Sequence, residues 1–256
     1  MNDLPAFLLR KADEYNAPSF IPADPICVPH SFSKKQDIEI AGFFAAIFAW
    51  GNRTTIIGKT KELMALMGNS PHNFILHHKE KERERLLGFK HRTFTATDLL
   101  WFVQVLQQHY QRYDSLETAF FPTPVKAQEH AVKHGLIRLQ QTFFSTPGAP
   151  MRTRKHLSSP ERNSGCKRLN MFLRWMVRHD NSGVDFGLWK NIAPADLIMP
   201  IDLHVARVAK RFGLMERKLP DWQAAEELTA YFRTIDPEDP VRFDFALFGL
   251  GVLEKF

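Results

Sequence analysis

The stretch Pro200-Ile201-Asp202-Leu203-His204-Val205 contains the clearest helix start in this sequence. Asp202 stands where an N-cap residue belongs, because its carboxylate can accept hydrogen bonds from the free amides of the first turn and is favoured by the helix dipole. Val205 and Val208 then lie on one apolar face of the helix that follows. The stretch therefore predicts a helix over residues 202–212.

A second helix is predicted upstream, over residues 167–179, and a connection of about twenty residues joins it to the first. Its apolar residues recur at helical spacing and form a core stripe. The adjoining stripe carries three cations, so we expect a positively charged ridge along this helix. The core stripe consists of Leu169, Phe172, Leu173 and Met176, and the ridge of Lys167, Met171, Arg174 and Arg178.

Helical spacing of apolar residues continues through most of the chain, and no segment shows strand alternation between hairpin turns. We therefore expect an all-α protein. The stretch 145–163 is rich in proline, hydroxyl and basic residues, and it predicts a loop or mobile lid rather than packed structure. Further helices are predicted over 33–51, 54–67, 95–112, within 125–144, and over 222–235 and 239–249.

Composition excludes several classes of protein. The chain has 256 residues, of which 44% are hydrophobic and 24% charged, as in ordinary globular domains. The longest apolar run, Ile40–Trp50, is too short to cross a bilayer, and the first residues do not form a secretory signal. Cys27 and Cys166 are too few to hold an iron–sulfur cluster or a cysteine-rich zinc site. We expect a cytoplasmic protein without a membrane segment, a metal or a cofactor.

The net charge of +6 is unevenly distributed. Residues 152–178 hold eight basic residues and one acid, a balance of +7, whereas residues 179–256 are net negative. A concentrated basic segment attracts polyanions, and nucleic acid is the first candidate. The alternative interpretation is a solvated surface loop that is merely basic.

Two stretches carry a resemblance to a known family. The stretch Pro200–Val205, followed by Arg207 and Arg211, resembles the Pro-x-Asp-x-His-Val signature of helix-hairpin-helix DNA glycosylases. Residues 40–53 and the helix after them resemble the first conserved helix pair of that superfamily. The layout is most similar to the archaeal-type 8-oxoguanine glycosylase branch, in which the hairpin is unusually long. The whole chain also resembles an uncharacterised, mostly bacterial family of conserved proteins, and residues 167–178 are the recognisable run.

The resemblance implies base excision repair. Such enzymes flip a damaged base out of duplex DNA and break its bond to the sugar. By matching position, Lys167 would be the nucleophile that forms a Schiff base and cleaves the strand, and Asp202 would orient the amine and stabilise positive charge on the sugar. An oxidised purine such as 8-oxoguanine is the expected substrate, double-stranded DNA the partner, and the protein a nucleoid-associated monomer. The residues expected to contact nucleic acid are Asn52, Arg53, Arg154, Lys155, Arg162, Arg168, Arg174, Arg178 and His204.

The expected architecture is a single unit over residues 1–256 with two intimate helical subdomains and a cleft between them. Residues 35–145 would form the first subdomain and residues 146–163 a basic loop or lid. Residues 164–256 would form the helix-hairpin-helix subdomain, packed with the N-terminal segment.

The connection over residues 181–200 departs from the family pattern, because a short glycine-rich turn normally offers amides to a phosphate there. We expect Trp189 to plug the core beneath this connection. Two alternative functions stay open: a non-catalytic nucleic-acid-binding protein that retains the fold, and a helical protein whose basic ridge docks an acidic partner. Asp202 could equally be an N-cap alone, and Lys167 a surface residue.

Overall fold

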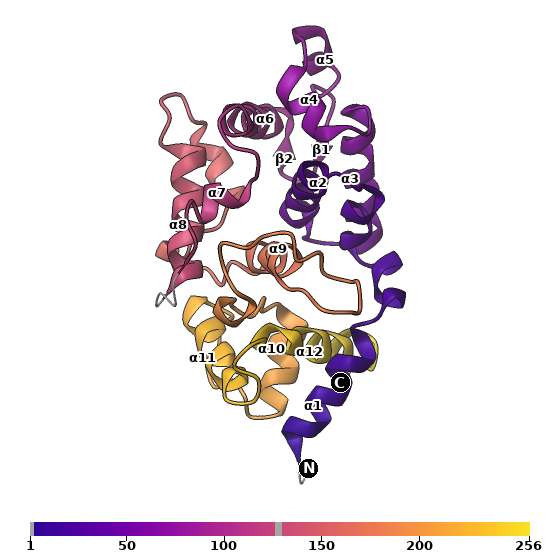
Figure 1. Ribbon diagram of the computed structural model, residues 1–256, viewed down its shortest axis with the longest axis vertical. Helices are drawn as coiled ribbons and strands as arrows, with labels where there is room; N and C mark the ends of the chain where they lie inside the picture. The colour runs from indigo at the N-terminus through magenta and orange to yellow at the C-terminus, as the bar shows by residue number, and fades with distance from the viewer. Residues whose placement is uncertain (1–2, 126–129) are drawn as a thin grey trace. The chain divides into compact units, whose positions relative to one another are not determined.

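The structure is a computed structural model that describes residues 3–125 and 130–256 (Figure 1). Its regular structure is almost entirely helical, which confirms the all-α prediction. The two strands among the described residues, β1 (Lys90–His91) and β2 (Phe94–Thr95), pair in one short antiparallel hairpin. None of the helices in these ranges is both long and apolar enough to cross a membrane.

The α-helices match the predicted segments closely, but no helix was predicted over residues 4–15, 71–77 or 117–120. Part of the helix predicted within 125–144 lies outside the described residues. The helices are α1 (Leu4–Tyr15), α2 (Lys35–Phe48), α3 (Arg53–Leu66), α4 (Pro71–His77), α5 (Glu80–Glu84), α6 (Ala96–Tyr110), α7 (Glu117–Phe120), α8 (Ala131–Phe144), α9 (Lys167–Val177), α10 (Leu203–Arg211), α11 (Trp222–Arg233) and α12 (Phe243–Val252).

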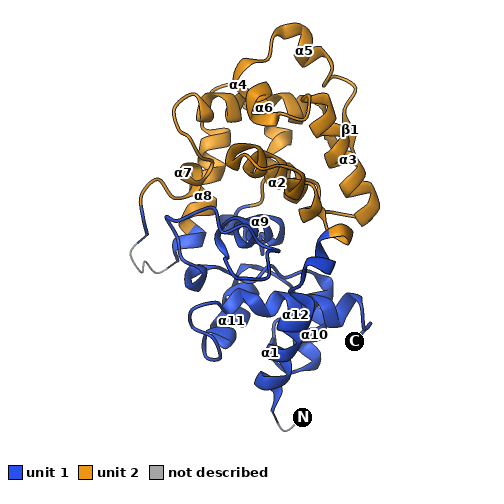
Figure 2. Ribbon diagram, turned by 45° about the vertical axis from the view of Figure 1, so that its right-hand side comes forward, with its two compact units in different colours: residues 1–21, 124–133, 159–256 blue, residues 22–123, 134–158 orange. Residues whose placement is uncertain are grey.

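The chain divides into two compact units, shown in blue and orange in Figure 2. Unit 1 combines residues 1–21, 124–133 and 159–256, and unit 2 combines residues 22–123 and 134–158. Each unit is therefore assembled from segments that are distant in the sequence.

Helix α2 is the centre of unit 2. Every residue from Ile38 to Phe48 is buried, because neighbouring helices cover this largely apolar segment. Its one charged residue, Glu39, accepts hydrogen bonds from Tyr110, Ser115 and the amide of Leu116. Phe43 stacks on Phe102 of α6, with ring centroids 5.9 Å apart, and Phe102 packs against Phe143 of α8 at 4.9 Å. Aromatic rings thus fill the space between α2, α6 and α8.

Unit 1 is built around α9 and α12. The nine residues from Leu169 to Val177 in α9 are all buried. Helix α12 is apolar apart from Asp244, and it packs against both α1 and α10. The close approach of α1 depends on Gly249, because a Cβ added there would lie 2.2 Å from the Tyr15 ring.

The stretch 145–163 is more regular and more closely packed than the predicted loop or mobile lid. Residues 151–156 form a 3₁₀ helix, η4 (Met151–His156). Because side chains three residues apart eclipse one another in such a helix, Thr153 and His156 both face inward and are buried, while Arg152 and Lys155 face outward. The buried residues of η4 therefore recur at every third position, between basic residues that face outward.

Candidate active site

Lys167 and Asp202, which are 35 positions apart in the sequence, lie side by side in unit 1. The ammonium nitrogen Nζ of Lys167 is 3.7 Å from Oδ2 of Asp202, and the two side chains are 27% and 23% exposed. The same Nζ lies 3.6 Å from the sulfur of Met171, one helical turn further along α9. The pair is thus partly desolvated and still accessible from outside.

The backbone of α10 fixes the carboxylate of Asp202. Its Oδ1 accepts hydrogen bonds from the amides of His204 and Val205, each 2.9 Å long. Asp202 is therefore the N-cap of α10, as the sequence predicted. Its other oxygen, Oδ2, faces Lys167. One carboxylate caps the helix and pairs with the amine.

The loop before α9 positions Lys167. Cys166 and Asn163 both adopt left-handed backbone conformations, with φ of 47° and 53°. Side-chain amides hold this strained loop: Asn170 Nδ2 donates to the carbonyl of Gly165 at 3.1 Å, and Asn163 Nδ2 donates to Asp221 at 3.2 Å. Strained backbone persists only where tertiary contacts enforce it, so the start of α9 is held rigidly.

A buried acid lies close to the pair. Asp244 of α12 is hydrogen-bonded to Arg174. Burial, together with the negative charge of Asp202, raises the pKa of Asp244 to about 6, while the positive charges of Arg174 and Lys167 oppose that shift. The sequence analysis missed Asp244, although a lone carboxylate in the otherwise apolar stretch 243–252 was a visible signal.

The predicted cationic ridge on α9 is wrong for Arg174 and Arg178. Both residues are buried, with 3% and 2% of their surface exposed. Arg174 pairs with Asp185 and Asp244. Arg178 pairs with Asp180, Asp185 and Asp239. These arginines do not form an exposed ridge, because the connection after α9 and the start of α12 bring carboxylates onto them.

The long connection between α9 and α10 packs directly onto α9. Its amides at Phe186 and Trp189 donate to the carbonyls of Trp175 and Met176, at 2.8 and 2.9 Å. Trp189 is 1% exposed, and its ring packs edge-on against Phe172. This confirms the prediction that Trp189 plugs the core.

The remaining predicted residues of unit 1 differ in exposure. Arg162 and His204 are exposed, and Arg168 is half-buried, so that burial lowers the pKa of its guanidinium. His204 lies beside Asp202 through its backbone amide, and its Nδ1 is 3.4 Å from Nη2 of Arg207.

Four of the predicted residues belong to unit 2. Asn52 is exposed and caps α3 by accepting a hydrogen bond from the amide of Thr55, and Arg53 is the half-buried first residue of that helix. Arg154 is half-buried over the ring of Phe144 and donates to its carbonyl. Lys155 is exposed.

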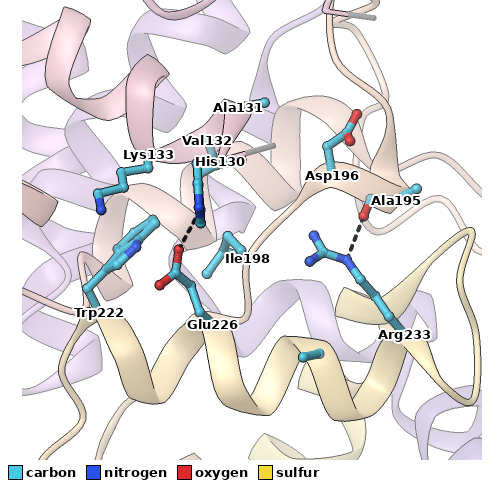
Figure 3. Close-up of a pocket in the computed structure, with 11 residues that line it drawn as sticks. His130, Ala131, Val132, Lys133, Ala195, Asp196, Ile198, Trp222, Glu226 and Arg233 are labelled. Atoms are coloured by element: carbon cyan, nitrogen blue, oxygen red, sulfur yellow. Dashed lines mark hydrogen bonds and ion pairs between the residues drawn. The ribbon is translucent and has the colours of Figure 1, made fainter. Parts of the chain in front are cut away.

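Unit 1 also contains a pocket of about 500 Å³, and neither Lys167 nor Asp202 lines it (Figure 3). His130 and Glu226 are joined by a hydrogen bond across one side, with Nδ1 and Oε1 3.0 Å apart. Arg233 donates its Nε to the carbonyl of Ala195 at 3.1 Å. The pocket is therefore a separate feature of this unit.

Comparisons with known proteins give one match. The family model described as "Protein of unknown function (DUF2400)" matches residues 24–253. No curated protein and no solved structure matches the chain. Within the described residues, no group of three or more histidine, cysteine, aspartate or glutamate side chains could hold a metal ion.

Proposed function

Since the chain belongs to the DUF2400 family, whose description assigns no function, we propose one from the Lys167–Asp202 pair. The protein is a DNA glycosylase of base excision repair. It breaks the N-glycosidic bond of a damaged base, with an oxidised purine such as 8-oxoguanine as the preferred substrate. The observation that carries the proposal is the separation of 3.7 Å between the amine of Lys167 and the carboxylate of Asp202.

The pair supports a reaction on the sugar in four steps: displacement of the base, ring opening, elimination and hydrolysis. After the ammonium of Lys167 has given a proton to water, its amine attacks the anomeric carbon as the bond to the base breaks, and the base leaves with the bonding electrons and takes up a proton. Asp202 stabilises the positive charge that develops on the sugar. The attached nitrogen then loses a proton and expels the ring oxygen O4′, which is protonated, and a Schiff base results. Loss of a C2′ proton to water with departure of the 3′ phosphate cuts the strand, and water hydrolyses the Schiff base to release the lysine.

The surroundings of the pair suit this chemistry. A quarter of each side chain is exposed, so a base and its sugar that have been flipped out of a duplex can reach both groups. Two backbone amides fix the carboxylate, which keeps it from moving as charge develops. The partner is double-stranded DNA, and the protein acts as a monomer on the nucleoid.

Borohydride trapping tests the proposal. The protein is incubated with duplexes that each contain one 8-oxoguanine, uracil or abasic site, and borohydride then reduces any Schiff base to a stable adduct. We expect an adduct with the wild-type protein and none with Lys167→Gln. Lys210→Gln is the matched control, because Lys210 is an exposed lysine of α10.

Asp202→Asn tests the carboxylate separately from the helix cap. Asparagine caps a helix as well as aspartate does, so thermal unfolding should be unchanged, whereas the trapping rate should fall about a hundredfold or more. An adduct that persists in Lys167→Gln would refute the proposed nucleophile. Salt-dependent DNA binding without cleavage, unchanged by Asp202→Asn, would instead indicate a non-catalytic nucleic-acid-binding protein.

A further inference from the structure

In unit 2, Trp50 in the turn after α2 contacts Arg92 in the hairpin turn between β1 and β2. The guanidinium of Arg92 lies 4.8 Å from the centre of the Trp50 ring, and its Nη1 is 3.5 Å from the Trp50 carbonyl oxygen. Arg92 has a left-handed backbone, with φ of 55°. Gly51, which follows Trp50, has φ of 103°, a conformation that favours glycine, and the guanidinium of Arg92 lies directly over it. The guanidinium of Arg92 therefore packs against the Trp50 ring and the backbone of Gly51.

A second arginine is attached to the same hairpin turn. Arg152, on the outer face of η4, donates from Nη1 to the hydroxyl of Thr95 at 3.0 Å and from Nη2 to the carbonyl of Thr93 at 3.1 Å. Lys155 follows Arg152 by one 3₁₀ turn, so both side chains project from the same outward face.

The carboxylate beneath these residues offsets only part of their charge. Asp98 is fully buried and lies 3.5 Å from Arg152 Nη2. Burial alone would raise its pKa, but hydrogen bonds from Thr153 and Thr95 lower the pKa of Asp98 overall, so it is ionised at neutral pH. Arg92 pairs with no carboxylate in the described part of the chain. Arg92, Arg152 and Lys155 therefore form a net positive surface, the hairpin-turn surface.

We propose that the hairpin-turn surface binds the phosphate backbone of duplex DNA. This inference rests on the proposed function, to which it adds a contact surface in unit 2. A ring face, two backbone carbonyls and a hydroxyl hold the two guanidiniums, so little side-chain entropy is lost when they bind. Guanidinium groups bind phosphate through paired hydrogen bonds, and the remaining N–H groups of these arginines are donors for that purpose.

The salt dependence of DNA binding tests this surface without any reference to cleavage. The affinity for a labelled, undamaged duplex is measured by fluorescence anisotropy for the wild type, for Arg92→Gln/Arg152→Gln and for Lys155→Gln. Each phosphate contact contributes about 0.9 to the slope of log affinity against log salt. We expect the slope to decrease by about 2 in the double variant and by about 1 in Lys155→Gln.

Control variants separate charge from folding. Arg83→Gln removes an exposed cation from α5, where charges of both signs alternate, and should leave the slope unchanged. Arg92→Lys/Arg152→Lys keeps the charges and should retain most of the slope. The surface is refuted if Arg83→Gln and Lys155→Gln change the slope equally, or if the wild type does not bind DNA at low salt. A protein that shows the expected slopes but forms no borohydride adduct would refute the proposed reaction and leave this surface standing.

Discussion

At the scale of single residues, the two carboxylate oxygens of Asp202 have different roles. One caps a helix, and the other belongs to the candidate active site. Oδ1 caps α10 through two amides, and Oδ2 faces the amine of Lys167. The sequence indicated the cap, because aspartate before an apolar helical pattern is a common signal. The resemblance to glycosylases suggested Lys167 as the partner, but only the fold could bring the two groups to 3.7 Å.

Asp244 gives a prediction about pH at this scale. An unfolded aspartate has a pKa of about 3.9, and burial raises the pKa of Asp244 to about 6. The folded state therefore holds the proton more tightly, and the stability that Asp244 contributes falls as the pH rises from about 4 to about 6. Compared with Asp244→Asn, the wild type should lose about 2 to 3 kcal/mol of unfolding free energy across that interval.

Urea unfolding of both proteins at a series of pH values measures this difference. The comparison with Asp244→Asn removes the contributions of the other carboxylates, some of which change stability in the opposite direction. Asp98 and Asp180, for example, have lowered pKa values and therefore stabilise the fold as the pH rises. A difference that stays constant between pH 4 and 6 would contradict the raised pKa of Asp244.

At the scale of elements, helical periodicity identified α9 but not its surroundings. Arg174 and Arg178 lie on one stripe of the helix, and a stripe of cations is usually exposed. Here that stripe faces Asp185 and other carboxylates from distant segments, and each arginine is buried with its partners. At η4, by contrast, residues that the structure buries at every third position were predicted to lie in a loop or mobile lid.

Two helical glycines give opposite predictions for one substitution. Gly58 of α3 has open space where a Cβ would project, so Gly58→Ala should stabilise the protein by about 0.5 to 1 kcal/mol through helix propensity. Gly249→Ala would push the new methyl group into the Tyr15 ring, and overpacking of this kind costs about 1 to 3 kcal/mol. Thermal unfolding of both variants checks the signs. Equal shifts would show that α1 does not pack as closely on α12 as described.

At the scale of the whole molecule, contacts between distant segments hold unit 1 together. Arg178 of α9 binds Asp180 and Asp185 from the long connection and Asp239 from the segment before α12. Arg242 similarly joins Asp13 of α1 to the C-terminal half of the chain. Unit 1 is therefore held together in part by ion pairs between segments far apart in the sequence.

Removing the charge of Arg178 should destabilise unit 1 strongly. In Arg178→Met, the buried Asp185 and the partly buried Asp239 would lose a countercharge, and breaking a buried ion pair in this way costs about 3 to 5 kcal/mol. Arg217→Met is the control, because its pair with Asp221 is more exposed, and it should change the unfolding midpoint far less. Similar midpoints for the two variants would mean that the Arg178 cluster is not a structural link.

The sequence by itself determined most of the helices and the cap at Asp202, because periodicity, capping and turn chemistry act between residues a few positions apart. It also supplied the DUF2400 match over residues 24–253. Only the tertiary structure decided that Lys167 meets Asp202, that Arg174 and Arg178 are buried, and that Arg92 and Arg152 share one hairpin turn. These contacts depend on which charged groups the fold brings together. The residues next to a charged side chain in the sequence do not indicate which partner it will bind.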